Sequence, residues 1–205
     1  MKSGFVNIFG KPNAGKSTLL NALMGEKMAI VSPKVQTTRH RIKGFLTKAG
    51  EYQIIFSDTP GIIETKYKLH EKMMHAVKSS MEDADVCLLV ADLRDDLLEL
   101  DNIFSSLKIK KNAILVLNKC DMVKKDRIEM AEAYFKDKPY CKKIVTISAA
   151  SKLHIDQLQN AIIDMLPEGE PFYDQEDLTD LPTRFFAGEL IREKIFELFD
   201  EEIPY

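Results

Sequence analysis

The sequence predicts an α/β fold: a doubly wound, mostly parallel sheet with one antiparallel strand and helices on both faces. Three observations support this. Short apolar stretches alternate along the chain with stretches of helical composition. Two of them, DVCLLVA at 85–91 and AILVL at 113–117, are apolar along almost their whole length, as in strands buried on both faces of a parallel sheet. A glycine-rich run, GKPNAGKST at 10–18, joins the first expected strand to the first expected helix.

Strand and helix are expected to alternate through the chain. The first part is expected to hold strand 5–9, helix 17–24, loop 28–39, strands 41–47 and 52–57, and helix 69–81. The second part is expected to hold strand 85–91, helix 95–107, strand 113–117, helix 126–135, strand 143–147 and helix 155–166. Gly25 ends the first helix, and a turn at Ala49 and Gly50 makes an antiparallel hairpin. Repeated strand–helix units of this kind build a doubly wound sheet.

Residues 1–166 are expected to form one domain, followed by a linker at 167–183. The linker contains PEGEPFYDQEDLTDLP, which is rich in proline and acidic residues. Residues 184–205 are expected to begin a second domain with a helix. Apolar residues recur there at helical spacing, at positions 186, 190, 191, 195, 198 and 199.

Composition limits the function classes. The chain has 205 residues, 45% of them hydrophobic, with a formal net charge of −3, so its overall charge does not favour a polyanion and any nucleic-acid surface must be local. No apolar run approaches the roughly 18–20 residues of a membrane span, and the N-terminus does not read as a signal peptide. The three cysteines, at 87, 120 and 141, show no CxxC spacing, which favours a reduced, cytosolic protein without a zinc site.

The glycine-rich run fits the phosphate-loop pattern GxxxxGK[ST] through Gly10, Gly15, Lys16 and Ser17. Its backbone N–H groups and the helix N-terminus are expected to surround phosphates. Lys16 is expected to reach the β- and γ-phosphates, and the Ser17 hydroxyl to bind Mg²⁺. The expected phosphate-binding residues are Gly10, Lys11, Pro12, Asn13, Ala14, Gly15, Lys16, Ser17 and Thr18.

A second motif, Asp58-Thr59-Pro60-Gly61, follows the expected strand at 52–57. A carboxylate at the C-terminal end of a strand lies where open α/β sheets bind their ligands. Asp58 is expected to hold Mg²⁺ through water, and the Gly61 N–H to meet the γ-phosphate. The segment after Gly61 should then respond to the presence of that phosphate. Thr59, Pro60 and Ile62 are expected to line the same site.

A third motif, Asn118-Lys119-Cys120-Asp121, follows the second buried strand. An ionised Asp121 only accepts hydrogen bonds, and guanine offers it two adjacent donors that adenine lacks. The stem of Lys119 is expected to lie along the base, and Asn118 to brace the surrounding loops. Backbone N–H groups of Ser148 and Ala149 are expected, from their position alone, to meet the base oxygen.

In this order the motifs resemble the Era family of bacterial GTPases, over essentially the whole chain. The matching segments are GKPNAGKSTLLN at 10–21, SPKVQTTRHRIKG at 32–44, FSDTPGI at 56–62, NKCD at 118–121, SAASK at 148–152 and the tail PTRFFAGELIREKIFELFDEEIPY at 182–205. The resemblance implies a P-loop GTPase fold, Mg²⁺-dependent hydrolysis of GTP to GDP, and binding to small-subunit ribosomal RNA during assembly of the small ribosomal subunit.

The resemblance also implies an RNA-binding domain of KH type, which grips RNA through a GxxG loop. The tail matches only the linker and first helix of that domain, and no GxxG follows before Tyr205. We therefore expect a truncated KH domain and weakened or lost RNA binding. A monomer in the cytoplasm is expected, and family members also associate peripherally with the inner membrane.

Hydrolysis is expected to involve Lys16, Gly61 and a threonine of the 28–41 loop. Thr38 is the expected Mg²⁺ ligand, with Thr37 as the alternative. Related switch GTPases place a water-orienting Gln where this chain has Ile62, so unaided turnover should be slow. In sister families an Asn at the position of Asn13 coordinates K⁺, which implies K⁺ activation.

Two forms of this function remain open. The chain is either a GTPase switch whose nucleotide state governs docking to the ribosomal subunit, or an RNA-docking module in which hydrolysis only times release. A small-molecule kinase would share the phosphate loop, but the NKCD motif argues against it.

Overall fold

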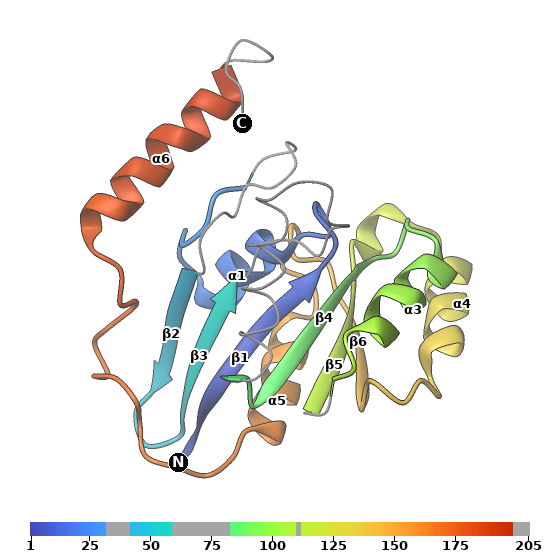
Figure 1. The fold of residues 1–205 in the computed structure, drawn as a ribbon, viewed down its shortest axis with the longest axis horizontal. Coiled ribbons are helices and arrows are strands. Elements are labelled where there is room, and N and C mark those ends of the chain that lie inside the picture. The colour runs from blue at the N-terminus through green and yellow to red at the C-terminus, as the bar shows by residue number, and fades with distance from the viewer. Residues whose placement is uncertain (32–41, 59–82, 110–111, 199–205) are drawn as a thin grey trace.

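The structure, a computed structural model, describes residues 1–31, 42–58, 83–109 and 112–198 (Figure 1). Its strands are β1 (Lys2–Gly10), β2 (Ile42–Lys48), β3 (Tyr52–Asp58), β4 (Val86–Asp92), β5 (Asn112–Asn118) and β6 (Lys143–Thr146). Its helices are α1 (Lys16–Met24), α3 (Leu97–Ser106), α4 (Lys125–Phe135), α5 (Ile155–Met165) and α6 (Thr183–Leu198), with a 3-10 turn at Cys120–Met122. The expected helix 69–81 lies outside the described residues.

The six strands form one sheet in the order β2-β3-β1-β4-β5-β6. The pairings of β1 with β3 and β4, of β4 with β5, and of β5 with β6 are parallel. Among the described strands only β2 runs antiparallel, paired with β3 in the expected hairpin. The predicted doubly wound, mostly parallel sheet with one antiparallel strand is therefore confirmed.

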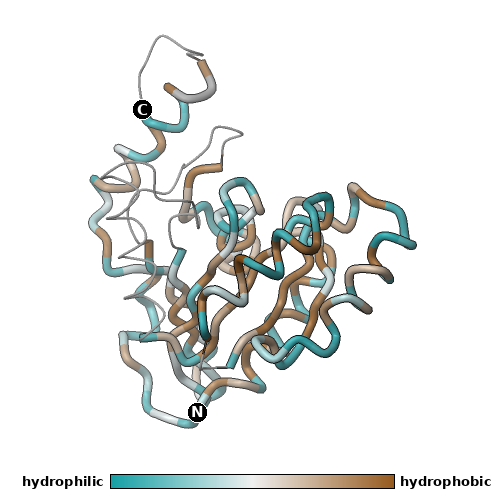
Figure 2. Tube along the Cα trace, turned by 45° about the vertical axis from the view of Figure 1, so that its right-hand side comes forward, coloured by the Kyte–Doolittle hydropathy of each residue, from teal (hydrophilic) through white to brown (hydrophobic). Residues whose placement is uncertain are grey.

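Helices cover both faces of the sheet, as predicted (Figure 1). On one face α1 and α5 pack over Ile8, Leu88 and Ile114. On the other, α3 and α4 pack over the next residues along the same strands, such as Phe9 and Leu89. Side chains alternate across a strand, so near-continuous apolar runs supply both cores at once. Figure 2 shows this as hydrophobic colour along the central strands.

The linker was expected at 167–183, but Thr183 already belongs to α6. Residues 167–169 lie beside the start of β1, and the following residues run along the hairpin. The fully buried Gln53 of β3 holds this segment through both ends of its amide: its Oε1 accepts from the N–H groups of Phe172 (2.7 Å) and Tyr173 (3.1 Å), and its Nε2 donates to Tyr173 O (2.8 Å). Further on, Phe45 N of β2 donates to Leu178 O at 2.8 Å. The segment thus covers the edge of β2, which would otherwise expose unpaired backbone groups.

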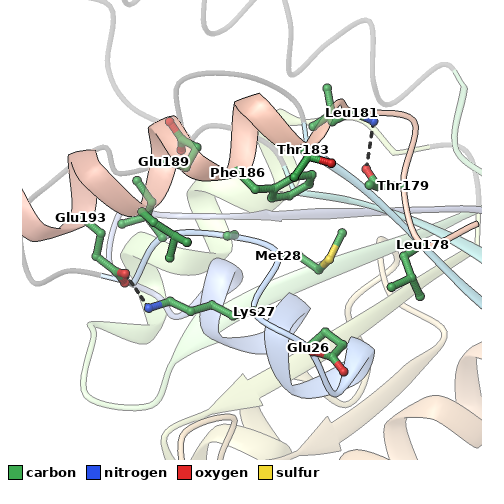
Figure 3. A pocket seen from close by; sticks show the side chains of 13 residues that line it. Glu26, Lys27, Met28, Leu178, Thr179, Leu181, Thr183, Phe186, Glu189 and Glu193 are labelled. Carbon is green, nitrogen blue, oxygen red and sulfur yellow. Dashed lines mark hydrogen bonds and ion pairs between the residues drawn. The ribbon is translucent and has the colours of Figure 1, made fainter.

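The predicted C-terminal helix exists as α6, but its apolar residues do not form one buried stripe. Leu190 and Ile191 are 49% and 64% exposed, whereas Glu193 is 2% exposed. At its start α6 packs Phe185 and Phe186 against the core on the face of α1 and α5. Farther along, a groove of about 340 Å³ lies between α6, the segment after α1 and residues 178–181 (Figure 3). There Glu193 forms an ion pair with Lys27 at 2.5 Å and accepts a hydrogen bond from Val31 N at 3.3 Å.

Within the described residues, no helix combines the length and the apolar composition that a membrane span requires.

Candidate nucleotide-binding site

The predicted motifs meet at one edge of the sheet. The phosphate loop connects β1 to α1, Asp58 ends β3, and Asn118 ends β5. The chain places β3 on one side of β1 and β4 on the other, so the order of strands reverses beside the loop. Open α/β sheets bind ligands at such a reversal, outside the carboxyl ends of the strands.

Two glycines let the phosphate loop approach its neighbours. A Cβ at Gly10 would stand 2.4 Å from Val90 O of β4, and a Cβ at Gly15 would stand 2.3 Å from Asn118 Nδ2. Gly15 also has φ 95°, which L side chains rarely adopt. Asn13, at φ 62°, has a left-handed conformation that Asn tolerates better than most residues. The loop therefore packs against the ends of β4 and β5.

Lys16 is the buried cation of the site. Its side chain bends back over the loop, and its Nζ donates to Lys11 O at 2.8 Å. Burial lowers the pKa of Lys16 to about 8, and the nearby Asp58 carboxylate only partly opposes the shift. A phosphate bound beside Lys16 would favour its protonated form and so oppose the effect of burial on its pKa.

Ser17 and Asp58 form the candidate metal site. Ser17 Oγ donates to Asp58 Oδ2 at 2.8 Å, and Asp58 is fully buried at the end of β3. A hydroxyl and a carboxylate are hard oxygen donors of the kind Mg²⁺ prefers. Since Mg²⁺ in nucleotide sites is held by one or two protein groups together with phosphate oxygens, these two residues fit it. The described residues hold no cluster of three or more His, Cys, Asp or Glu suited to a metal.

Asn118 braces the loops, as expected. Its Nδ2 donates to Ala14 O at 2.9 Å, and its Oδ1 accepts from Ala149 N at 3.0 Å. The side chain is 1% exposed, so both bonds are made away from water. They connect the phosphate loop to the loop after β6. In the adjoining 3-10 turn Cys120 faces the core, and Asp121 is exposed where a ligand can reach it.

The backbone amides of Ser148 and Ala149, which are expected to meet the base oxygen, follow β6. In the structure both have partners within the protein. Ala149 N donates to Asn118 Oδ1, and Ser148 N donates to Leu153 O at 3.2 Å. The buried Asn118 carbonyl needs a donor, and the Ala149 amide supplies it. Their contact with a base therefore remains a prediction.

Two carboxylates that the motifs did not include, Asp92 and Glu99, pair with lysines of the motifs beside the phosphate loop. Lys119 Nζ donates to Asn13 O at 2.7 Å and pairs with Asp92 Oδ2 at 2.7 Å. Lys11 pairs with Glu99 of α3 at 2.9 Å. Asp92 ends a buried strand in the same way as Asp58, and this sequence signal could have identified it. Nothing in the sequence indicated the partner of Lys11.

Several expected site residues lie outside the described residues: Thr37, Thr38, Thr59, Pro60, Gly61 and Ile62. Their expected roles in metal binding, γ-phosphate sensing and hydrolysis remain predictions. Pro12 lies in the phosphate loop, and Thr18 lies in the first turn of α1.

Comparison with known proteins identifies the family. The family model for 50S ribosome-binding GTPases matches residues 5–119. A GTPase Era from Thermoanaerobacter sp. (strain X514) is 42% identical over 206 residues, which span all of this chain and 68% of that protein. The chain belongs to the Era family of GTPases. Its resemblance to Era, based on the motifs, is thereby confirmed.

Solved Era structures share the fold. The chain matches a crystal structure of an Aquifex aeolicus Era variant bound to GDP·AlF4⁻ with a TM-score of 0.93 at 41% identity, over the whole chain and 70% of that structure. It matches Era in complex with MgGDPNP and nucleotides 1506–1542 of 16S ribosomal RNA with a TM-score of 0.92 at 42% identity, again over the whole chain and 70% of that structure. The P-loop GTPase fold is therefore confirmed.

Proposed function

We propose that this chain binds guanine nucleotides at the edge formed by Lys16, Asp58 and Asn118, and that it hydrolyses GTP to GDP and phosphate as a nucleotide-dependent switch. The convergence of these side chains supports the proposal most directly. A buried lysine, a hydroxyl–carboxylate pair and an asparagine brace, brought together from separate strands, form a phosphate and metal site. The related structures contain guanine nucleotides, one of them with Mg²⁺.

In this proposal the loop amides and Lys16 hold the β- and γ-phosphates. The Ser17 hydroxyl and the Asp58 carboxylate hold Mg²⁺, with Thr38 as a third proposed ligand. The ion neutralises charge on the phosphates when it is bound. Burial of Lys16 strengthens its attraction to a phosphate, since water screens it less there than at the surface.

Base selection is assigned to Asp121. Its exposed carboxylate can accept from N1–H and the 2-amino group of guanine, whereas adenine would leave it unpaired. Lys119 lies beside Gly15, with its Cε 3.8 Å from where a Cβ would stand, so its stem can face the base. Ala149 remains a proposed contact of the base oxygen.

For hydrolysis we propose slow intrinsic turnover with K⁺ activation. Ile62 offers no polar group to orient water, and Asn13 holds the position that binds K⁺ in sister families. The expected result is faster GTP turnover in KCl than in NaCl at equal ionic strength. Equal rates in the two salts would overturn K⁺ activation but not GTP binding.

The proposed partner is small-subunit ribosomal RNA, as in the related Era complex that contains a 16S fragment. We propose the division into a GTPase domain at 1–166, a linker at 167–183 and the start of a KH-type domain at 184–205. A cytoplasmic monomer with peripheral membrane association is part of the same proposal. Turnover measured with and without small subunits separates a switch, which the subunit accelerates, from a docking module, which it does not.

The first test is a calorimetric titration with GDP, GTP and ATP in the presence of Mg²⁺, repeated in K⁺ and Na⁺. We expect GDP and GTP to bind and ATP to bind at least about a hundredfold more weakly, because a buried or desolvated carboxylate left unpaired costs several kcal/mol. Equal affinity for ATP and GTP would contradict the proposal and favour a kinase.

A further inference from the structure

The carboxylate of Asp92 lies at the carboxyl end of β4, directly opposite Asn118 in the parallel ladder with β5. It is 5% exposed. Its Oδ1 accepts from Arg94 N and Nε, both at 3.0 Å, and its Oδ2 accepts from Arg94 at 2.7 Å. The same Oδ2 meets Lys119 Nζ at 2.7 Å. Burial raises the pKa of Asp92, but these donors outweigh it and lower the pKa to about 2.

Lys119 connects this carboxylate to the phosphate loop. Its ammonium also donates to Asn13 O at 2.7 Å, so one cation bridges the end of β4 and the loop. The backbone of Lys119 has φ 65°, a left-handed conformation that directs the chain into the 3-10 turn carrying Asp121. The position of the Lys119 side chain is therefore set at one end by its backbone and at the other by the Asp92 carboxylate.

A lysine side chain is flexible and strongly hydrated, so a free ammonium at this edge would sample water rather than one position. The Lys119 side chain is 21% exposed and its partner carboxylate 7% exposed. An ion pair this poorly solvated is screened less than a surface pair and holds its geometry. The stem of Lys119 is thus laid across the loop before any nucleotide arrives, and preorganisation of this kind lowers the cost of binding.

We propose that Asp92 is a positioning residue for guanine-nucleotide binding, which acts by holding Lys119 across the phosphate loop and against the Asn13 carbonyl. This inference rests on the proposed function, because it assigns Lys119 to the base. Arg94 shares the carboxylate but, within the described residues, its hydrogen bonds go to Asp92 and not to the phosphate loop, so it serves as a comparison for the route through Lys119.

The test is a double-mutant cycle on GDP affinity with Asp92→Asn, Lys119→Met and the double variant. Asp92→Asn keeps the shape of the side chain but removes its charge. It should raise the Kd for GDP about tenfold, and Lys119→Met should raise it by at least as much. In the Lys119→Met background, Asp92→Asn should change Kd by less than about twofold, because its route of action is already removed. A purely structural Asp92 would lower thermal stability without this non-additivity.

Controls separate the outcomes. Arg94→Ala, which leaves the Asp92–Lys119 pair intact, and Lys125→Met, which removes an exposed lysine of α4, should each leave Kd within about twofold of the parent. If Asp92→Asn does not fold, Asp92→Glu takes its place in the cycle, with the charge kept but displaced by one methylene. An unchanged Kd in the Asp92 variant, or effects that add in the double variant, would overturn the inference alone. An unchanged Kd in Lys119→Met would overturn the base contact as well.

Discussion

Gly15 shows how a single residue type permits the site. Its position combines a left-handed backbone with the close approach of the Asn118 side-chain amide, which is hydrogen-bonded to Ala14 and Ala149. A methyl group there would displace the Asn118 amide and break the connection between two loops. Gly25 also has a positive φ, of 72°, but a Cβ there would meet nothing within 4 Å.

Gly15→Ala should therefore cost more than Gly25→Ala. We expect Gly25→Ala to lower the free energy of unfolding by about 1 kcal/mol through backbone strain alone, with GDP affinity unchanged. Gly15→Ala should cause a similar backbone strain and should also raise the Kd for GDP at least about tenfold. Urea unfolding and GDP titration measure the two effects. Unaltered GDP binding in Gly15→Ala would show that the Asn118 brace is not needed.

At the scale of elements, the segment 167–182 is held to the sheet by side chains that the sequence does not mark. Gln53 satisfies backbone groups of Phe172 and Tyr173, and the ring of Tyr173 stacks on Phe45 with centroids 3.9 Å apart. A proline- and acid-rich composition predicts a linker, and residues 167–182 form no helix and no named strand. It does not predict attachment, because attachment depends on a residue more than a hundred positions away.

Gln53→Ala should loosen this segment. It would leave the N–H groups of two residues and one carbonyl without their buried partner, at a cost of about 1–3 kcal/mol in unfolding free energy. Limited proteolysis should then cut within 167–182 faster than in the parent. Gln157→Ala, at an exposed position on α5, is the matched control and should change neither. Equal cleavage rates in Gln53→Ala and the parent would contradict the attachment.

The central strands β4 and β5 were predictable because they are apolar on both faces along almost their whole length. Predicted 85–91 and 113–117 became Val86–Asp92 and Asn112–Asn118, within about a residue at each end. The apolar spacing in α6 predicted its helix but not its orientation: Glu193 faces inward to Lys27, and Ile191 faces out. The spacing of apolar residues indicates which side of a helix is apolar, but it does not indicate which other element packs against that side.

The site follows the same division. Lys16, Ser17, Asp58 and Asn118 were predictable because sequence motifs fix their spacing and their place, at the start of α1 for the first two and at strand ends for the others. Asp92 was missed, although it too ends a buried strand, because a lone carboxylate has no motif to connect it to Lys119. The hydrogen bond from the Ala149 amide to Asn118 was not predicted, because it depends on how the buried Asn118 side chain is satisfied in the folded protein.

On the scale of the whole molecule, two apolar cores on opposite faces fix the register of one sheet, and that register fixes the site. The parallel pairing sets Asp92 beside Asn118, and β1 carries the phosphate loop between β3 and β4. A slip of one residue in a strand would turn its core side chains to the wrong face, so the fold holds these polar ends in place.

The measurement that tests the central claim most directly is the base preference of Asp121→Asn, compared with Asp126→Asn at an exposed position on α4 as the control. We predict that Asp121→Asn raises the Kd for GDP at least about a hundredfold. The variant should bind xanthosine diphosphate better than GDP, because the amide NH2 group can donate to the 2-oxo group of xanthine where the carboxylate accepted from the 2-amino group of guanine. The control should keep the parent's preference for GDP. A variant at position 121 that still prefers GDP over xanthosine diphosphate would contradict the account.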